Sequence, residues 1–176
     1  MDGPQARTHR PECGAGARGG APPLNILVLV SGNGSNLEAL IRARLREGRI
    51  DTVISDRPGV YALERARLAG IPCRVERMNR ALPQGERRRE LSDRILGIAR
   101  ERRIGLIILA GFLSILEGEI IRAYAGRIIN LHPALLPKYG GAGMYGERVH
   151  RAVLAAGETE SGCTVHLVDG GTDTGP

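Results

Sequence analysis

Residues 25–36 read NILVLVSGNGSN, and this stretch decides the fold. Residues 25–30 are almost entirely aliphatic, which is typical of a strand buried on both faces of a sheet. A glycine-containing turn follows at residues 31–36, and over residues 37–45 apolar side chains recur at helical spacing. We expect Gly48 to end that helix. A buried strand, a short turn and an amphipathic helix make up the opening unit of a parallel α/β sheet.

The same alternation continues along the chain. Strand patterns cover residues 51–55, 73–75, 104–110, 127–131 and 163–168, and helix patterns cover residues 58–70, 86–102 and 147–156. We expect Asp56 to cap the second helix and Pro58 to lie in its first turn. Short links between strands and helices predict an α/β fold with a doubly wound, mostly parallel sheet. In such sheets ligands bind beyond the carboxyl ends of the strands.

The composition narrows the class of protein. The 176 residues are 42% hydrophobic and 25% charged, which suffices for one folded domain. No apolar run approaches the roughly 18 residues of a membrane helix. Three cysteines without a CxxC motif offer no disulfide framework. The net charge is +6, but only 3% of residues are aromatic and basic residues alternate with acidic ones, so we expect no nucleic-acid binding. We expect a cytoplasmic protein that acts on small molecules.

The N-terminal residues differ in composition from the rest of the chain. Residues 1–23 hold five glycines and four prolines without apolar periodicity, and we expect a disordered extension there. The folded domain is expected to span residues 24–176. Cys73 and Cys163 lie in strand patterns, which favours small buried side chains at both positions.

The turn after the first strand is a candidate anion site. Gly32 and Gly34 permit unusual backbone angles and close approach of a ligand. The free N–H groups at the start of the next helix favour an anion, and Ser35 and Asn36 add side-chain donors, so a phosphate monoester fits. The turn is not a dinucleotide fingerprint, because that motif needs a glycine where Leu37 stands. An ordinary tight turn with a helix cap is the alternative.

A polar pair lies at the end of the strand pattern at 127–131. Asn130 and His132 are two residues apart, so they point to the same side of the strand. An imidazole beside a carboxamide suits acyl or formyl transfer, in which one group moves a proton and the other donates a hydrogen bond to the developing oxyanion. The alternative is a hydrogen-bonded structural histidine with an asparagine turn.

Two carboxylates follow the last strand pattern in the glycine-rich segment 169–176. Asp169 and Asp173 are candidates for turn formation, for calcium binding, or for orienting His132, and spacing alone leaves all three open. The patterns around His150 and His166 favour structural roles. We expect no metal site, because ligand residues do not cluster in the sequence.

Four segments in order, 25–40 (NILVLVSGNGSNLEAL), 109–116 (LAGFLSIL), 129–139 (INLHPALLPKY) and 164–176 (TVHLVDGGTDTGP), resemble the phosphoribosylglycinamide formyltransferases. The N-x-H-P-x-L-L-P segment is shared by folate-dependent formyltransferases in general, and the SGNGSN turn points to the branch that acts on glycinamide ribonucleotide. The resemblance implies a Rossmann-like formyltransferase fold. It also implies transfer of a formyl group from 10-formyltetrahydrofolate to the amine of that ribonucleotide, in de novo purine biosynthesis, by a monomer or homodimer.

Roles for individual residues follow from the same resemblance. It implies that Asn130 hydrogen-bonds the formyl oxygen, that His132 transfers the proton, and that Asp173 holds His132. The ribonucleotide phosphate would be bound by Gly34, Ser35 and Asn36. The folate would be bound by Arg88, Leu113, Ser114, Ile115, Leu116 and Asn130.

The chain departs from this family in two places. The loop at residues 140–148 reads GGAGMYGER, a variant of the family's loop, and the family continues with further strand and helix beyond the equivalent of Pro176. We therefore expect a C-terminally truncated chain with an exposed sheet edge. The alternatives are a related folate-dependent formyltransferase with another amine acceptor, or a catalytically impaired phosphate-binding module.

Overall fold

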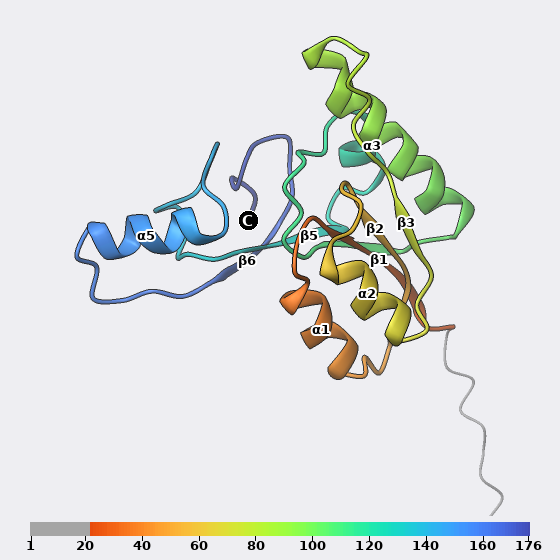
Figure 1. Ribbon diagram of the computed structural model, residues 1–176, viewed down its shortest axis with the longest axis horizontal. Coiled ribbons are helices and arrows are strands. Elements are labelled where there is room, and N and C mark those ends of the chain that lie inside the picture. The colour runs from red at the N-terminus through yellow and green to blue at the C-terminus, as the bar shows by residue number, and fades with distance from the viewer. Residues whose placement is uncertain (1–21) are drawn as a thin grey trace, which may run out of the picture.

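The computed structural model describes residues 22–176, so all but the last two residues of the predicted extension at 1–23 lie outside the described part. The elements, in chain order, are β1 (Leu24–Val30), α1 (Ser35–Arg42), β2 (Gly48–Ser55), α2 (Tyr61–Leu68), β3 (Cys73–Val75), α3 (Gln84–Glu101), β4 (Leu106–Leu109), α4 (Glu119–Ala123), β5 (Ile128–His132), α5 (Glu147–Ala155) and β6 (Thr164–Leu167). Figure 1 shows their arrangement.

One sheet contains these six strands in the order β3-β2-β1-β4-β5-β6. Every neighbouring pair is parallel except β5 and β6, which run antiparallel. The predicted α/β fold with a mostly parallel, doubly wound sheet is therefore confirmed. The strand order reverses direction between β1 and β4, and a crevice opens beyond the carboxyl ends of the strands at such a switch point.

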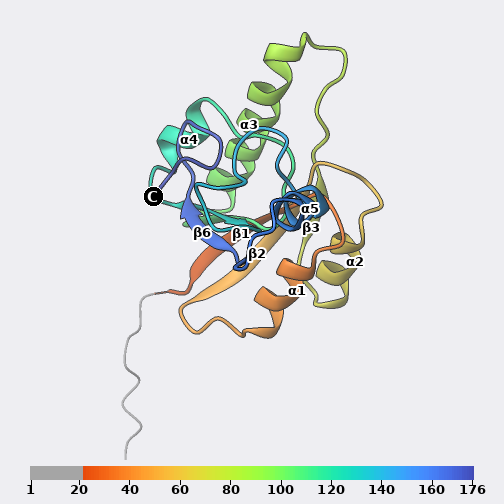
Figure 2. The ribbon, with the colours of Figure 1, turned by 90° about the vertical axis from the view of Figure 1, so that its left-hand side faces the viewer.

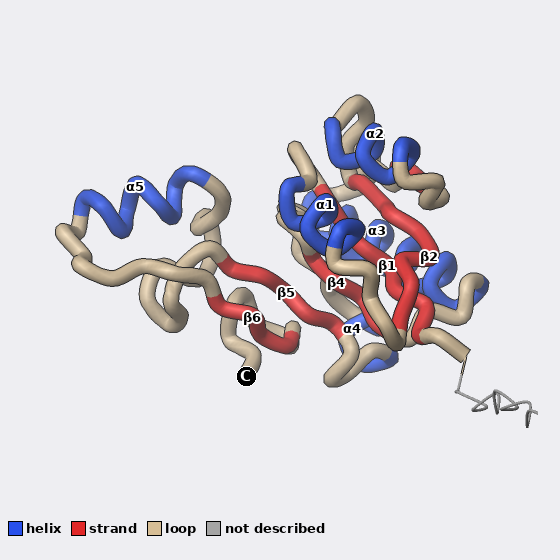
Figure 3. Tube along the Cα trace, turned by 90° about the horizontal axis from the view of Figure 1, so that it is seen from below, coloured by secondary structure: helices blue, strands red, loops and turns tan. Residues whose placement is uncertain are grey.

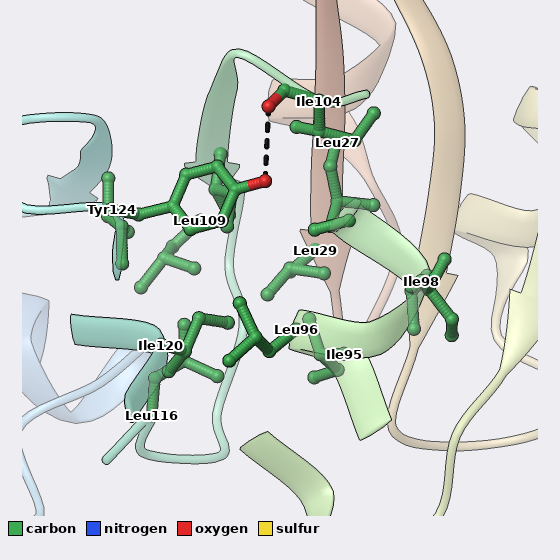
Figure 4. Close-up of a cluster of buried hydrophobic side chains, with 14 of the residues drawn as sticks. Leu27, Leu29, Ile95, Leu96, Ile98, Ile104, Leu109, Leu116, Ile120 and Tyr124 are labelled. Carbon is green, nitrogen blue, oxygen red and sulfur yellow. Dashed lines mark hydrogen bonds between the residues drawn. The ribbon is translucent and has the colours of Figure 1, made fainter. Parts of the chain in front are cut away.

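Helices cover both faces of the sheet (Figures 1 and 2). Alternate residues of β1 enter two separate cores, which is why its sequence is aliphatic throughout. Val28 packs with Leu37 of α1 and Ala62 of α2. Leu29 packs on the other face with Ile95 of α3, in the cluster drawn in Figure 4. In that cluster the buried Tyr124 hydroxyl donates a hydrogen bond to the carbonyl oxygen of Ile104 at 3.0 Å.

The segment that contains α5 lies apart from this three-layer body (Figure 3). Val149 and Val153 of α5 are buried against Ala134, and Tyr139 and Met144 pack onto the same small cluster. This cluster, residues 134, 139, 144, 149 and 153, is separate from the two sheet cores. The loop that follows β5 packs on α5, and Thr164 of β6 also holds it through hydrogen bonds with the Leu136 N–H and the Ala134 carbonyl oxygen.

Several local predictions were wrong. Gly48 begins β2, because α1 already ends at Arg42. Asp56 and Pro58 lie in a loop, and α2 begins at Tyr61 after Val60. The short helix α4 was not predicted. Cys73 and Cys163 are exposed. Both lie in or beside an edge strand, where a side chain has a neighbouring strand on one side only.

The central strand sets the stability of the whole sheet. Leu29 is completely buried, and its replacement by alanine removes apolar contacts and leaves a cavity between β1 and α3. We expect Leu29→Ala to lower the free energy of unfolding in urea by about 2–5 kcal/mol. Leu154→Ala is the matched control, because Leu154 is 77% exposed on α5, and its effect should stay within about 0.5 kcal/mol. Similar losses in the two variants would contradict this account of the core.

Candidate active site

A cleft of about 800 Å³ opens at the switch point between β1 and β4. Its lining includes residues from the turn after β1, from the loop after β4, from β5 and from the segment after β6. Ser31 ties the first two of these together. Its backbone N–H donates to Gly111 O at 3.0 Å, and its hydroxyl oxygen accepts the N–H of Leu113 at 2.8 Å.

The turn after β1 has a backbone shape that only glycine adopts readily. Gly34 has φ +79°, and a Cβ atom at this position would lie 2.6 Å from the Cβ of Ala62 on α2. Helix α1 begins at the next residue, so its first N–H groups have no partner within the helix. Arg65 holds the turn from the outside, since its Nε donates to Asn33 O at 3.0 Å while the guanidinium pairs with Glu38.

The side chains of Ser35 and Asn36 line the same cleft as the end of β5. Ser35 is exposed and Asn36 is half-buried. The start of α1 therefore offers backbone and side-chain donors at one part of the cleft, which is the arrangement that binds a phosphate group in other proteins. Gly34 shapes this turn and is not itself among the lining residues.

Asn130 and His132 project from β5 toward the segment after β6. His132 is 3% exposed, and Asn130 is half-buried. The antiparallel pairing places His166 of β6 directly opposite Asn130. The Asn130 Nδ2 donates to His166 Nε2 at 3.1 Å and to Asp173 Oδ1 at 3.3 Å.

The carboxylate of Asp173 joins these side chains. Its Oδ2 lies 3.5 Å from His132 Nδ1 and accepts the N–H of Gly141 at 3.0 Å. Its Oδ1 lies 3.6 Å from His166 Nε2. Asp173 itself has φ +56°, so the chain turns through a left-handed conformation to bring this carboxylate back over β5.

Hydrogen bonds to carbonyl oxygens fix where the two histidines carry a proton. His132 Nε2 donates to Tyr139 O at 2.8 Å, and His166 Nδ1 donates to Leu167 O at 2.9 Å, because a carbonyl oxygen can only accept. His132 Nδ1 therefore faces Asp173 and is the nitrogen left for proton exchange. His166 Nε2 is left as an acceptor for the Asn130 amide.

Asp169, the other carboxylate of this segment, forms the turn. It accepts the Thr174 hydroxyl at 2.7 Å and the N–H of Gly171 at 2.9 Å. These two hydrogen bonds, the one from Thr174 foremost, lower the pKa of Asp169. Of the alternatives that the sequence left open, turn formation therefore applies to Asp169, and proximity to His132 applies to Asp173.

All six predicted folate-binding residues line the cleft. Leu113, Ser114, Ile115 and Leu116 belong to the loop after β4, Arg88 to α3 and Asn130 to β5. Leu113 and Arg88 are exposed, whereas Leu116 is also part of the α3 core. The Ser114 hydroxyl donates to Asp56 Oδ2 at 2.7 Å, which fixes this loop to the end of β2.

Sequence reasoning missed His166, which is 5% exposed and contacts Asn130. The signal that would find it is the register of β5 with β6. Once those strands are paired antiparallel, His166 is the residue opposite Asn130. Within residues 22–176, no three side chains of His, Cys, Asp or Glu are grouped so that they could hold a metal ion. No helix there is long and apolar enough to cross a membrane.

Comparison with known proteins shows the family of this chain. The chain belongs to the formyl transferase family, whose model matches residues 24–176. It is 39% identical over 156 residues to phosphoribosylglycinamide formyltransferase of Escherichia coli K12, covering 87% of this chain and 69% of that protein. It is 43% identical over 159 residues to the trifunctional purine biosynthetic protein adenosine-3 of Drosophila melanogaster, covering 85% of this chain.

Solved structures show the same fold. Glycinamide ribonucleotide transformylase 1 of Symbiobacterium toebii superposes with a TM-score of 0.77 at 35% identity, covering 88% of this chain and 70% of that one. The phosphoribosylglycinamide formyltransferase of Coxiella burnetii gives 0.76 at 40% identity, covering 88% and 69%. The chain spans only 11% of the length of the Drosophila protein.

The turn after β1 allows a matched test of backbone shape. Gly34→Ala must place a side chain at positive φ and against Ala62, whereas a Cβ at Gly32 would meet nothing within 4 Å. We expect Gly34→Ala to lower the free energy of unfolding by at least about 1–2 kcal/mol, and Gly32→Ala to have a smaller effect. Urea unfolding measures both. Equal stability of the two variants would show that the turn is not constrained in this way.

Proposed function

We propose that this protein transfers a formyl group from 10-formyltetrahydrofolate to the amine of glycinamide ribonucleotide, a step of de novo purine biosynthesis. One observation carries the proposal. A single cleft is lined by the donors at the start of α1 and by Asn130, His132 and Asp173. Membership of the formyl transferase family and the names of the relatives support it. A formyltransferase with a different amine acceptor is the alternative that experiment must separate.

The cleft suits two substrates at once. The phosphate of the ribonucleotide would bind at the start of α1, through the backbone N–H groups and the side chains of Ser35 and Asn36. The loop of residues 113–116 and Arg88 would contact the folate. The amine and the formyl carbon would then meet beside Asn130 and His132, which are partly or wholly removed from solvent.

The chemistry requires one proton to move. The amine nitrogen attacks the formyl carbon and forms a C–N bond, which places negative charge on the formyl oxygen. The Asn130 N–H and a proton on His132 Nδ1 would stabilise that oxyanion. The bond between the formyl carbon and the folate nitrogen then breaks. The proton lost by the amine goes to the leaving nitrogen, and tetrahydrofolate is released.

We infer which contact of Asn130 a bound formyl oxygen would replace. Both N–H groups of the Asn130 amide face protein acceptors, His166 Nε2 at 3.1 Å and Asp173 Oδ1 at 3.3 Å. A formyl oxygen must take the place of one of them. The contact with Asp173 is the longer, so we expect it to be the one given up, while His166 continues to orient the amide.

Turnover with defined substrates tests the proposed function. The purified chain is incubated with 10-formyltetrahydrofolate and glycinamide ribonucleotide, and release of tetrahydrofolate is followed. Formyl-accepting methionyl transfer RNA serves as the control acceptor. We expect turnover when glycinamide ribonucleotide is the acceptor and none when the transfer RNA is the acceptor. Turnover with the transfer RNA would show that the enzyme uses another amine acceptor. Release of formate in the absence of both acceptors would show that it hydrolyses the formyl-folate instead.

Removal of the proton-transferring group should greatly lower kcat without weakening substrate binding. We expect His132→Ala and Asp173→Asn each to lower kcat by about 10²–10⁴-fold, because one removes the acid and the other its carboxylate partner. Steady-state kinetics with both substrates measures this. Asp93→Asn, an exposed position on α3, is the control and should keep the kcat of the original chain. Near-normal kcat in both site variants would remove these residues from the mechanism.

The phosphate contacts should affect one substrate only. We expect Ser35→Ala with Asn36→Ala to raise KM for the ribonucleotide by about tenfold or more, since each side chain donates a hydrogen bond to a charged group. KM for the folate should stay level. Ser161→Ala, in an exposed loop, is the control for a surface serine. Equal increases in both KM values would mean that the start of α1 does not bind the phosphate.

A further inference from the structure

Tyr139 connects His132 to a cluster of polar side chains outside the cleft. Its backbone carbonyl oxygen accepts a hydrogen bond from His132 Nε2 at 2.8 Å. Its hydroxyl donates to Glu158 Oε1 at 2.9 Å, on the loop after α5. One residue thus has its main chain at the candidate catalytic histidine and its side chain on a carboxylate 19 positions further along the chain.

The backbone at Tyr139 needs support from elsewhere. Its φ is +57°, in the left-handed region that a bulky L-residue rarely adopts and that costs roughly 1–2 kcal/mol. The conformation therefore persists only where surrounding contacts enforce it. The ring packs on the α5 cluster beside Val149 and Val153, and the hydroxyl hydrogen bond to Glu158 completes the restraint.

Glu158 is well suited to hold the Tyr139 hydroxyl, because its carboxylate stays charged. The same Oε1 also accepts Lys138 Nζ at 3.0 Å. The hydrogen bonds from Lys138 and then Tyr139 lower the pKa of Glu158. The side chain of Glu158 is 27% exposed and that of Lys138 is 68% exposed, and both border a small cavity of about 260 Å³ together with Tyr139 and Glu160. The hydroxyl of Tyr139 thus donates to a carboxylate that stays charged.

The Tyr139 carbonyl determines which ring nitrogen of His132 carries the proton. While the Tyr139 carbonyl is in place, Nε2 keeps its proton and Nδ1 faces Asp173. Loss of that carbonyl would let the ring adopt the other tautomer or turn, and Nδ1 would no longer be the exchanging nitrogen.

We propose that Glu158 is a positioning residue of the formyl-transfer site, which acts through the Tyr139 hydroxyl to fix the tautomer and orientation of His132. This inference rests on the proposed function for its kinetic consequence. Neither Glu158 nor the Tyr139 hydroxyl lines the cleft, so neither touches a substrate.

A double-mutant cycle tests the connection. We expect Tyr139→Phe and Glu158→Ala each to lower kcat by about tenfold with little change in either KM. The double variant should lose no more than either single variant, because both changes break the same hydrogen bond. Glu158→Gln keeps an acceptor oxygen and should recover most of the kcat. Glu160→Gln, exposed beside the same cavity, should match the original chain.

Losses that multiply in the double variant would mean that the two residues act separately, and the proposal would fail. It would also fail if KM rose and kcat did not fall, since that pattern reports a binding role. Urea unfolding of each variant shows whether it is folded at the assay temperature. Should the alanine variant unfold, the comparison of Tyr139→Phe with Glu158→Gln still decides.

A spectroscopic measurement separates this inference from the proposed function. Histidine labelled with ¹⁵N in the ring reports the tautomer of His132, and its signal is assigned by its loss in His132→Ala. We expect an Nε2-protonated ring in the original chain and in Glu158→Gln, and a mixture of tautomers in Tyr139→Phe. If the original chain shows no formyl transfer, the proposed function fails while this spectrum still decides the inference. An unchanged spectrum in Tyr139→Phe would overturn it.

Discussion

A single carboxylate organises the candidate site. Asp173 has only 11% of its side chain exposed, and a carboxylate so far removed from water must be surrounded by donors. It accepts hydrogen bonds from the Asn130 amide and the Gly141 N–H, and the ring of His132 faces it. These groups come from β5 and from the loop after it, whereas Asp173 itself belongs to the segment after β6. The carboxylate therefore fixes three parts of the chain relative to one another, and the site exists only while they are together.

The sheet supplies the other part of the cleft. Parallel strands bring their carboxyl ends to one edge, and the reversal of order between β1 and β4 sends the following segments to opposite faces. Ser31 links the turn after β1 to the loop after β4 by two hydrogen bonds. An anion at the start of α1 and a ligand against residues 113–116 would thus occupy parts of one rigid edge.

The segment from residue 133 to 161 contributes to the candidate site through the ring of His132. It forms a separate packing unit around α5, apart from the two sheet cores (Figure 3). Through Tyr139 this unit sets the hydrogen bond on the far nitrogen of His132. The two nitrogens of the ring are therefore controlled by different units, Nδ1 by the segment after β6 and Nε2 by the α5 unit. Such a division would let packing far from the cleft affect the proposed proton transfer within it.

The sequence by itself determined the features that repeat over short distances. The aliphatic run at 25–30, the turn at 31–36 and the two-residue spacing of Asn130 and His132 follow from local periodicity, and they sufficed for the sheet class and for two of the three catalytic candidates. Spacing left Asp169 and Asp173 equal, and the family resemblance favoured Asp173. Only the tertiary structure decided the contact distance between Asp173 and His132, the place of His166 and the exposure of Cys73 and Cys163. These depend on which strand lies beside which and in what register. That pairing joins residues far apart in the chain, so no local pattern encodes it.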